Sequence, residues 1–180
     1  MAQDVAVVVA SGRSVWTDLR AVRHLEPFAW FAVNDMVTYS PHVHHAVSHH
    51  PDKLALWDAL RTHSEGRGRR EPQIVTHSSA PGPGIARAWP EFKRGGSSSL
   101  LAVRIALALG HPHVIIAGVP LDDQGYVWSD PEAPRWYDFG RYRIAWAEAR
   151  NELIGRVTAV SGYLRDLLGA PELALTEAVA

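Results

Sequence analysis

The chain has 180 residues, of which 47% are hydrophobic and 21% charged, a size and composition that suit one globular domain and hardly two. Its 18 Lys and Arg against 19 Asp and Glu give a formal net charge of −1, so the overall charge gives no reason to bind nucleic acid. The absence of cysteine excludes disulfides, thiolate metal ligands and cysteine nucleophiles.

The N-terminal segment has a short apolar run and no basic region, so we expect no signal peptide. No stretch approaches the roughly 20 apolar residues that a membrane helix needs. We therefore predict a cytoplasmic protein that has no membrane partner.

Short apolar runs alternate with helical stretches in the first half of the chain. Val5–Ala10 is a continuous apolar run, typical of a parallel strand that is buried on both faces. The predicted order is a strand at Val5–Ala10, a helix at Val15–Leu25, strands at Ala29–Val33 and His44–His49, a helix at Asp52–His63 and a strand at Ile74–His77.

A stretch rich in glycine and proline, Ser78–Gly96, separates the two halves and is predicted to be irregular. Ser97–Ser99 open the next predicted helix, which runs to Leu109 and is closed by Gly110. This helix is apolar nearly all round, so we expect it to be buried. The remaining predicted elements are a strand at Val114–Ala117, a loop at Gly118–Pro134, a helix at Tyr137–Leu153, a strand at Arg156–Val160 and a helix at Tyr163–Leu168.

This alternation predicts a single α/β domain over residues 1–171, a three-layer, Rossmann-like sandwich with a mainly parallel sheet. Residues 172–180 are expected to form a C-terminal tail. Ligands of such sheets bind outside the carboxyl ends of the strands, so the loops at that edge are the candidate site.

Two turns at this edge combine glycine with serine before a predicted helix. Ser11, Gly12, Arg13 and Ser14 form the first turn, and Gly96, Ser97 and Ser98 belong to the second. Backbone N–H groups at the start of a helix attract anions, and arginine adds a charged donor. We expect Ser14, Ser97 and Ser98 to converge on one phosphate-sized site. The alternative for each turn is a tight turn in which serine caps the helix.

Polar and aromatic residues follow two further strands. Asn34 and Asp35 follow the strand at 29–33, where they could hold a ribose or a base edge or simply end the strand. Gly118, Asp122 and Tyr126 follow the strand at 114–117. A carboxylate there could bind a ribose, a metal ion or a substrate amine, and the aromatic ring could stack on a ligand. An exposed turn is the alternative.

Histidines gather around the predicted third strand, at positions 42, 44, 45, 49 and 50. Side chains alternate along a strand, so these histidines fall on two faces, and no spacing fixes a third metal ligand. We therefore predict no metal site. His50 comes just before a helix and can serve as a general acid or base, since free imidazole titrates near pH 6.5. The alternative is a half-buried histidine with its hydrogen bonds satisfied.

The order of these motifs resembles the small Rossmann-like bacterial sialyltransferases and the hydroxymethylpterin pyrophosphokinase-like domains. The likeness spans Val5–Ser129 and implies a parallel α/β sandwich that binds a nucleotide at the carboxyl edge. By position, Gly12 and Ser14 match the family's G-P-S turn, and Asn34 matches its strand-two asparagine. Ser97 and Ser98 match its nucleotide-contacting serines. Gly118 with Asp122 stands near its G-x-D element, and Tyr126 stands near a phosphate-contacting tyrosine. The closing SGYLRDLLGAP resembles small proteins of bacteriophages and prophages.

These observations favour a glycosyltransferase-like enzyme that uses a nucleotide or sugar nucleotide. His50 would be its base, with Asp122 as an alternative base or a Mg²⁺ ligand. The alternative is a non-catalytic module that binds or sequesters a nucleotide. The sialyltransferases have a catalytic histidine downstream of the loop that Gly118–Asp123 matches, and no histidine follows His113 here, which favours this alternative. A metal-dependent hydrolase that uses His42, His44 and Asp122 is a third, weaker hypothesis.

The sequence names no cofactor. Aromatic residues in and beside the predicted helix at 137–153 could form a homodimer face or belong to a partly buried amphipathic surface, and we favour the dimer. These residues are Trp136, Tyr137, Tyr142 and Trp146.

Overall fold

The computed structural model describes residues 5–65, 73–92, 96–122, 124–130 and 139–172. Within them, seven parallel strands form one sheet in the order β5-β4-β3-β2-β1-β6-β7. The strands are β1 (Val5–Val9), β2 (Ala29–Val33), β3 (His45–Ser48), β4 (Val75–Ser78), β5 (Arg87–Ala88), β6 (His113–Ala117) and β7 (Val157–Ala159).

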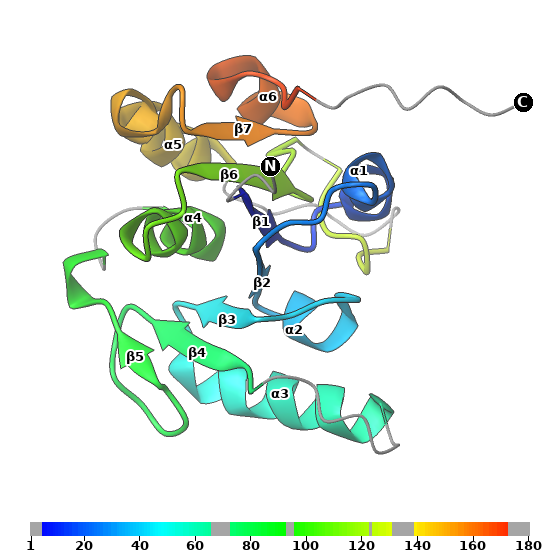
Figure 1. Ribbon diagram of the computed structural model, residues 1–180, viewed down its shortest axis with the longest axis vertical. Coiled ribbons are helices and arrows are strands. Elements are labelled where there is room, and N and C mark those ends of the chain that lie inside the picture. The colour runs from blue at the N-terminus through cyan, green and yellow to red at the C-terminus, as the bar shows by residue number, and fades with distance from the viewer. Residues whose placement is uncertain (1–4, 66–72, 93–95, 123, 131–138, 173–180) are drawn as a thin grey trace, which may run out of the picture.

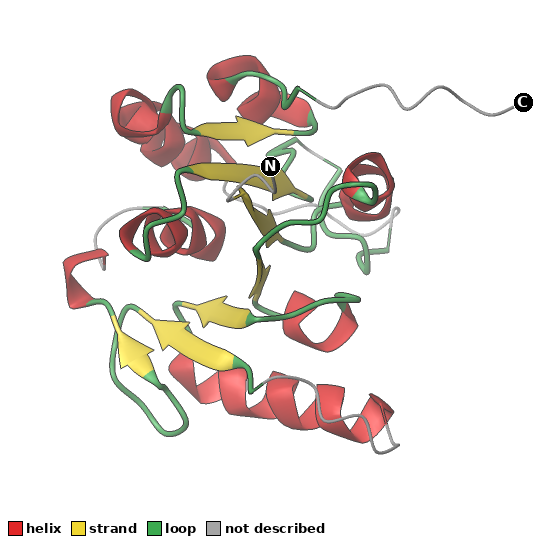
Figure 2. Ribbon diagram, in the orientation of Figure 1, coloured by secondary structure: helices red, strands yellow, loops and turns green. Residues whose placement is uncertain are grey.

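Helices cover both faces of this sheet, which confirms the predicted three-layer α/β sandwich (Figures 1 and 2). The helices are α1 (Val15–Val22), α2 (Met36–Tyr39), α3 (Pro51–Glu65), α4 (Ser98–Ala108), α5 (Phe139–Leu153) and α6 (Gly162–Leu168). Side chains of α1, α2 and α3 share one apolar cluster with one face of the sheet, and those of α4, α5 and α6 share a second cluster with the other face.

The chain reverses its direction of travel across the sheet at β1. From β1 it moves outward through β2, β3 and β4 to β5, and α4 then carries it back to β6 on the other side of β1. Parallel sheets open a crevice at such a switch point, outside the carboxyl ends of the two strands that flank it. This topology places the crevice at Ala10 and Gly118, directly after β1 and β6.

The most apolar strands and helix of the sequence form the interior, as predicted. Every residue of β1 is buried, and β1 pairs with β2 on one side and β6 on the other. Leu100, Leu101 and Ile105 of α4 are fully or almost fully buried against the sheet. A helix with so few polar positions has no face to offer water, so its burial follows from its composition.

The structure differs from the prediction at several short elements. Helix α1 ends at Val22 rather than Leu25, and β3 ends at Ser48, so His49 and His50 lie in the following loop. The stretch predicted to be irregular contains β5 and a single 3-10 turn at Pro90–Phe92. The predicted helix start at Tyr137 lies outside the described residues. None of the described helices is long and apolar enough to cross a membrane.

Candidate functional site

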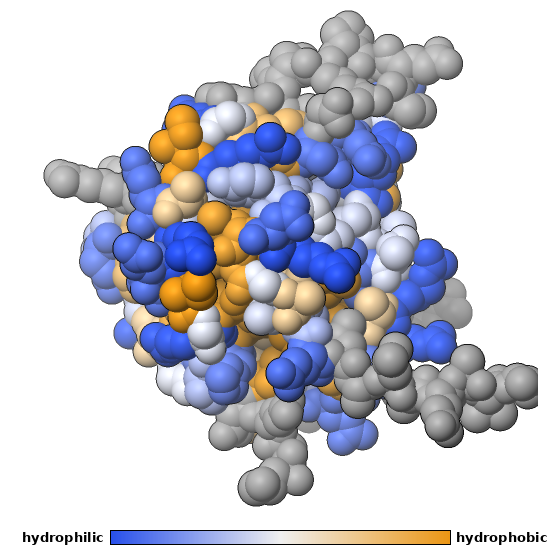
Figure 3. All heavy atoms as spheres, turned by 90° about the horizontal axis from the view of Figure 1, so that it is seen from above, coloured by the Kyte–Doolittle hydropathy of each residue, from blue (hydrophilic) through white to orange (hydrophobic). Residues whose placement is uncertain are grey.

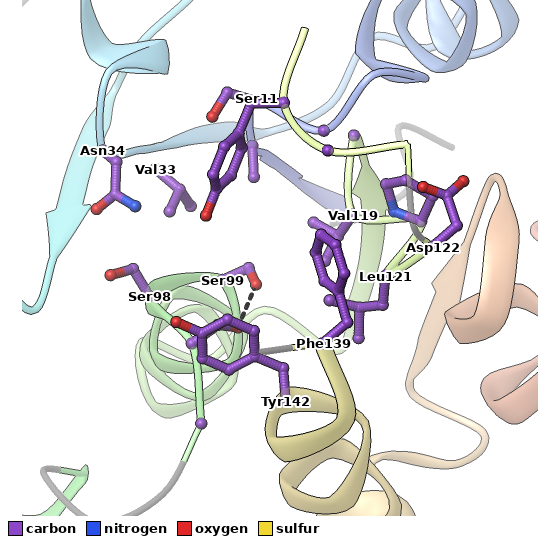
Figure 4. Close-up of a pocket in the computed structure, with 18 of the residues that line it drawn as sticks. Ser11, Val33, Asn34, Ser98, Ser99, Val119, Leu121, Asp122, Phe139 and Tyr142 are labelled. Carbon is purple, nitrogen blue, oxygen red and sulfur yellow. Dashed lines mark hydrogen bonds between the residues drawn. The ribbon is translucent and has the colours of Figure 1, made fainter. Parts of the chain in front are cut away.

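A pocket of about 460 Å³ opens at the switch point (Figure 4). Segments that follow β1, β2, β3 and β6 line it, together with the first turns of α4 and α5. Most of the predicted site residues meet here, namely Ser11, Gly12, Asn34, His50, Gly96, Ser97, Ser98, Gly118, Asp122 and Tyr126. Residues of both glycine-serine turns, Ser11 and Gly12 of the first and Gly96 to Ser98 of the second, line this pocket.

The remaining predicted site residues, Arg13, Ser14 and Asp35, lie outside the pocket lining and contact other parts of the protein. The guanidinium of Arg13 donates from Nε to the Gln124 carbonyl at 3.1 Å and from Nη2 to the Ser129 carbonyl at 2.8 Å. The carboxylate of Asp35 accepts from Trp128 Nε1 at 2.6 Å. Arg13 and Asp35 therefore fasten the loop at 124–129, which itself supplies Gly125 and Tyr126 to the pocket.

Ser14 belongs to a partly buried hydrogen-bonded cluster around Asp18. Its hydroxyl donates to Asp18 Oδ2 at 2.9 Å, and Ser161 Oγ lies 2.8 Å from the same oxygen. Gly118 N donates to this carboxylate oxygen at 2.8 Å. Asp18 is 2% exposed, so it ties α1 to the end of β6 and to the start of α6. The expected convergence of Ser14 with Ser97 and Ser98 on one anion is therefore not seen.

The first glycine-serine turn has little capacity left for an anion. Gly12 N donates to the Gly118 carbonyl at 2.8 Å, and Arg13 N donates to the Gly125 carbonyl at 3.1 Å. Gly12 also pairs with Tyr126 in an isolated antiparallel bridge. The expectation that this turn presents its N–H groups to a phosphate is wrong for Gly12 and Arg13, because the loop after β6 takes both donors. The turn forms a wall of the pocket.

The second turn caps α4 at the pocket. Ser97 is the residue before the helix, and its Oγ accepts from Leu100 N at 3.4 Å and contacts Ser99 Oγ at 2.6 Å. Gly96, just before it, has a φ of 101°, a conformation that glycine adopts without strain. The N-terminus of α4 carries a partial positive charge from its aligned peptide dipoles, and this end lies in the pocket wall. The anion-binding capacity predicted from the sequence therefore concentrates at α4.

His49 connects this turn to two strands. Its backbone N donates to Ser98 Oγ at 3.2 Å, and its Nδ1 lies 2.7 Å from Ser79 Oγ in the loop after β4. Burial, and then the neighbouring His50, lower the pKa of His49 below its usual 6.5. His49 is therefore neutral at physiological pH. Its ring joins the loop after β3 to the loop after β4, and its backbone N joins the same loop to the start of α4.

His50 and Asp122 are the predicted catalytic residues, and both line the pocket. His50 is exposed and its backbone N donates to Ser48 Oγ at 2.9 Å. Asp122 is half-buried and its Oδ1 accepts from Gln124 N at 3.0 Å. In the close-up, Asp122 lies on the side opposite Asn34 and Ser98 (Figure 4).

Sequence reasoning missed the contribution of α5. Phe139, Arg141 and Tyr142 in the first turn of this helix line the pocket beside Val119 and Leu121 (Figure 4). Phe139 and Tyr142 are three residues apart and so share one helix face. That spacing is visible in the sequence, but only the fold shows that the face meets the end of β6.

The other histidines of the cluster are dispersed. His45 Nδ1 lies 2.9 Å from His77 Nε2, and Trp89 Nε1 donates to His77 Nδ1 at 3.1 Å, so these residues form a chain that is mostly buried. His42 packs against Trp30, with ring centroids 5.4 Å apart. Across the described ranges, no group of three or more His, Asp or Glu side chains is arranged to hold a metal ion.

One aromatic residue expected at a homodimer face is buried inside the protein. Trp146 is fully buried in the core, so the expectation is corrected for this residue, whereas Tyr142 is partly buried and lines the pocket. Trp136 and Tyr137 lie outside the described residues. Seen from above the view of Figure 1, hydrophilic side chains interrupt the apolar ones (Figure 3). A homodimer stays a prediction.

Comparisons with protein-family models, curated proteins and solved structures find no match for this chain. The resemblance to sialyltransferases and pyrophosphokinase-like domains therefore stays a prediction. The functional interpretation depends on the geometry of the pocket.

Proposed function

We propose that this protein is a transferase that uses a nucleotide or sugar nucleotide and binds its phosphates at the start of α4. The observation that carries the proposal is the pocket at the switch point of the parallel sheet, with the N-terminus of α4 in its wall. Its volume of about 460 Å³ falls within the range of roughly 300–1,000 Å³ that small-molecule sites occupy.

The two sides of the pocket differ in chemistry, and this difference supports a ligand with a charged and an apolar part. Asn34 and Ser98 lie on one side, near the positive end of the α4 dipole. Val119, Leu121 and Phe139 lie on the other side (Figure 4). Phosphates belong on the first side, and a base or sugar ring fits the second, where apolar and aromatic surface can cover it.

His50 supports group transfer. An attacking hydroxyl or amine must lose a proton, and an imidazole at the pocket wall can take it. His50 is exposed at this wall, whereas Asp122 already accepts a backbone hydrogen bond. His50 is therefore the proposed base, and Asp122, on the side of the pocket opposite Asn34 and Ser98, is the alternative base (Figure 4).

A non-catalytic nucleotide-binding module is the second candidate, and two contacts favour it. Asp122 Oδ1 accepts from Gln124 N, which is a turn-forming contact, and the ring of His49 is paired with Ser79. Binding without turnover follows if His50 takes no proton. The two candidates share the same ligand and differ only in whether that ligand is consumed.

A thermal-shift titration tests the shared part of the proposal. UDP, GDP, CMP and UDP-glucose are each added to the protein, and a ligand at 100 times its Kd raises the free energy of unfolding by about 2.7 kcal/mol. The matched control is Ser98→Asp, which places a negative charge at the start of α4. We expect the variant to lose the shift, because the added charge repels a phosphate at this end of the helix. No shift from any of these compounds in the wild type contradicts the proposal.

A further inference from the structure

Ser48, the last residue of β3, is fully buried and sits between two polar groups of the pocket wall. Its Oγ accepts from His50 N at 2.9 Å and donates to Asn34 Oδ1 at 2.7 Å. A serine hydroxyl has a single proton. The structure gives Asn34 Oδ1 as the acceptor of that proton, so the amide oxygen faces Ser48.

This direction determines how the Asn34 amide presents itself to a ligand. Its oxygen faces Ser48, so its NH₂ group faces the pocket (Figure 4). The backbone of Asn34 is also held, since its N donates to the Val47 carbonyl at 3.0 Å and its φ of 55° is one that asparagine tolerates. The side chain therefore offers donors and no acceptor.

Ser98 also presents a hydrogen-bond donor on the same side of the pocket. Its Oγ accepts from His49 N at 3.2 Å, so its own proton is available to a ligand. Both donors are set by a group behind them, Ser48 for Asn34 and the His49 backbone for Ser98. Two donors on one wall match a ligand atom that only accepts hydrogen bonds.

We infer that Ser48 is a positioning residue that makes Asn34 a donor, and that the Asn34 and Ser98 side of the pocket binds an oxygen that only accepts hydrogen bonds, in a phosphate or a carboxylate. The inference rests on the proposed function only for the larger ligand that carries this group. Phosphate oxygens of the nucleotide and the carboxylate of a sugar acid are the two sources of this chemistry.

Asn34→Asp is the sharpest variant because it is isosteric. The aspartate still accepts from Ser48, yet it replaces the donor group with an anionic oxygen. Unpaired or opposed buried polar groups cost about 1–3 kcal/mol, which corresponds to a rise in Kd of about 5- to 150-fold. Calorimetry with UDP, UDP-glucuronic acid and inorganic pyrophosphate measures the Kd of the wild type and of the variant. A rise for UDP and pyrophosphate assigns a phosphate, and a rise confined to UDP-glucuronic acid assigns the carboxylate.

A double-mutant cycle tests whether Ser48 acts through Asn34. Ser48→Ala frees the amide to rotate, and we expect Kd to rise about 5- to 10-fold in the protein with Asn34. In an Asn34→Gly background, where glycine accepts the positive φ, the same change shifts Kd less than about twofold. Ser40→Ala is the matched control for a buried serine, since Ser40 is 2% exposed and its hydroxyl donates to the His42 carbonyl. It lowers stability and leaves Kd unchanged.

The outcomes separate this inference from the proposed function. If UDP and UDP-glucuronic acid each bind the wild type, Asn34→Asp and Ser48→Ala equally well, the inference is wrong and nucleotide binding stands. If pyrophosphate binds and is lost in Asn34→Asp, but no nucleotide binds, the inference stands and the proposed function is wrong. An equal effect of Ser48→Ala in both backgrounds overturns the positioning role. No binding of any probe overturns both.

Discussion

Gly12 and Gly118 meet backbone to backbone where β1 and β6 end, with Gly12 N donating to the Gly118 carbonyl at 2.8 Å. A Cβ on Gly12 would lie 2.6 Å from that carbonyl oxygen and 2.5 Å from Cδ of Pro120. Gly118 has a φ of 72°, and a Cβ there would overlap the Ala10 carbonyl. The floor of the pocket therefore requires both glycines, because no side chain fits between the two strand ends.

Replacement of Gly12 by alanine tests this close approach. The added methyl must displace backbone after β6, and overpacking of this kind costs about 1–3 kcal/mol. Chemical denaturation measures the loss in the free energy of unfolding. Gly140→Ala is the matched control, because Gly140 lies in α5 and a Cβ added there would meet no described atom of another segment within 4 Å. Alanine there stabilises the helix by up to about 1 kcal/mol. Similar effects of the two changes contradict the close approach.

Burial of α4 predicts a large cost for truncation of its core side chains. Leu101 is 2% exposed, and Leu101→Ala leaves a cavity against the sheet. Such substitutions cost about 2–5 kcal/mol, measurable by denaturant unfolding. Leu56→Ala on α3, where the side chain is 58% exposed, is the control and changes stability by less than about 0.5 kcal/mol. A negligible loss for Leu101→Ala would mean that the helix is not part of the core.

The pair of His45 and His77 predicts acid sensitivity. Burial, followed by repulsion from neighbouring charged groups, lowers the pKa of each to about 4 from the usual 6.5. Between these values the unfolded chain binds protons that the folded chain does not, so stability is complete above about pH 6.5 and falls as the pH drops towards 4. Below about pH 4 both states are protonated at these sites and the decline from them stops. Melting temperatures across pH 4–8 measure this dependence of stability on pH.

His77→Asn isolates this contribution, since its amide oxygen can still accept from Trp89 Nε1. We expect the variant to be less stable at pH 8 and to lose less stability than the wild type between pH 6.5 and 4. His113→Asn removes an exposed imidazole at the start of β6 and leaves the buried pair intact. A steep decline that persists in His77→Asn assigns the acid sensitivity to other groups.

The sequence predicted the fold best where burial and periodicity agree. Val5–Val9 and the helix from Ser98 are apolar at nearly every position, a pattern that an element exposed to water does not keep. Short elements escaped prediction because tertiary pairing forms them. Strand β5 has two residues, and it is held beside β4 by contacts such as Trp89 N to the Ser78 carbonyl at 2.8 Å. Local propensity over so few residues carries little information.

The location of the site followed from topology, whereas the use of each donor did not. The rule for parallel sheets brought Gly12, Asn34 and Ser98 to one edge, and the pocket contains all three. Whether a given N–H or hydroxyl remains available depends on partners distant in sequence. Gly125 takes the N–H of Arg13, and Ser48 orients Asn34, and no local pattern encodes either contact.

His50→Ala tests the proposed chemistry apart from binding. If His50 removes a proton from the acceptor, its loss lowers turnover by about 10²- to 10⁴-fold, the usual contribution of a general base. The thermal shift produced by the nucleotide stays nearly unchanged, because the proposed phosphate site is the start of α4 rather than the imidazole. Release of nucleotide from a sugar nucleotide in the presence of candidate acceptors measures turnover.

Asp122→Asn separates His50 from the alternative base. Its amide keeps an oxygen that can accept from Gln124 N, so the turn after β6 is preserved. A loss of turnover in Asp122→Asn with full activity in His50→Ala would transfer the base role to Asp122. Loss of both binding and turnover in His50→Ala would make His50 a ligand contact. Nucleotide binding without turnover under any acceptor would favour the sequestering module, because the ligand would then occupy the pocket next to a histidine that takes no proton.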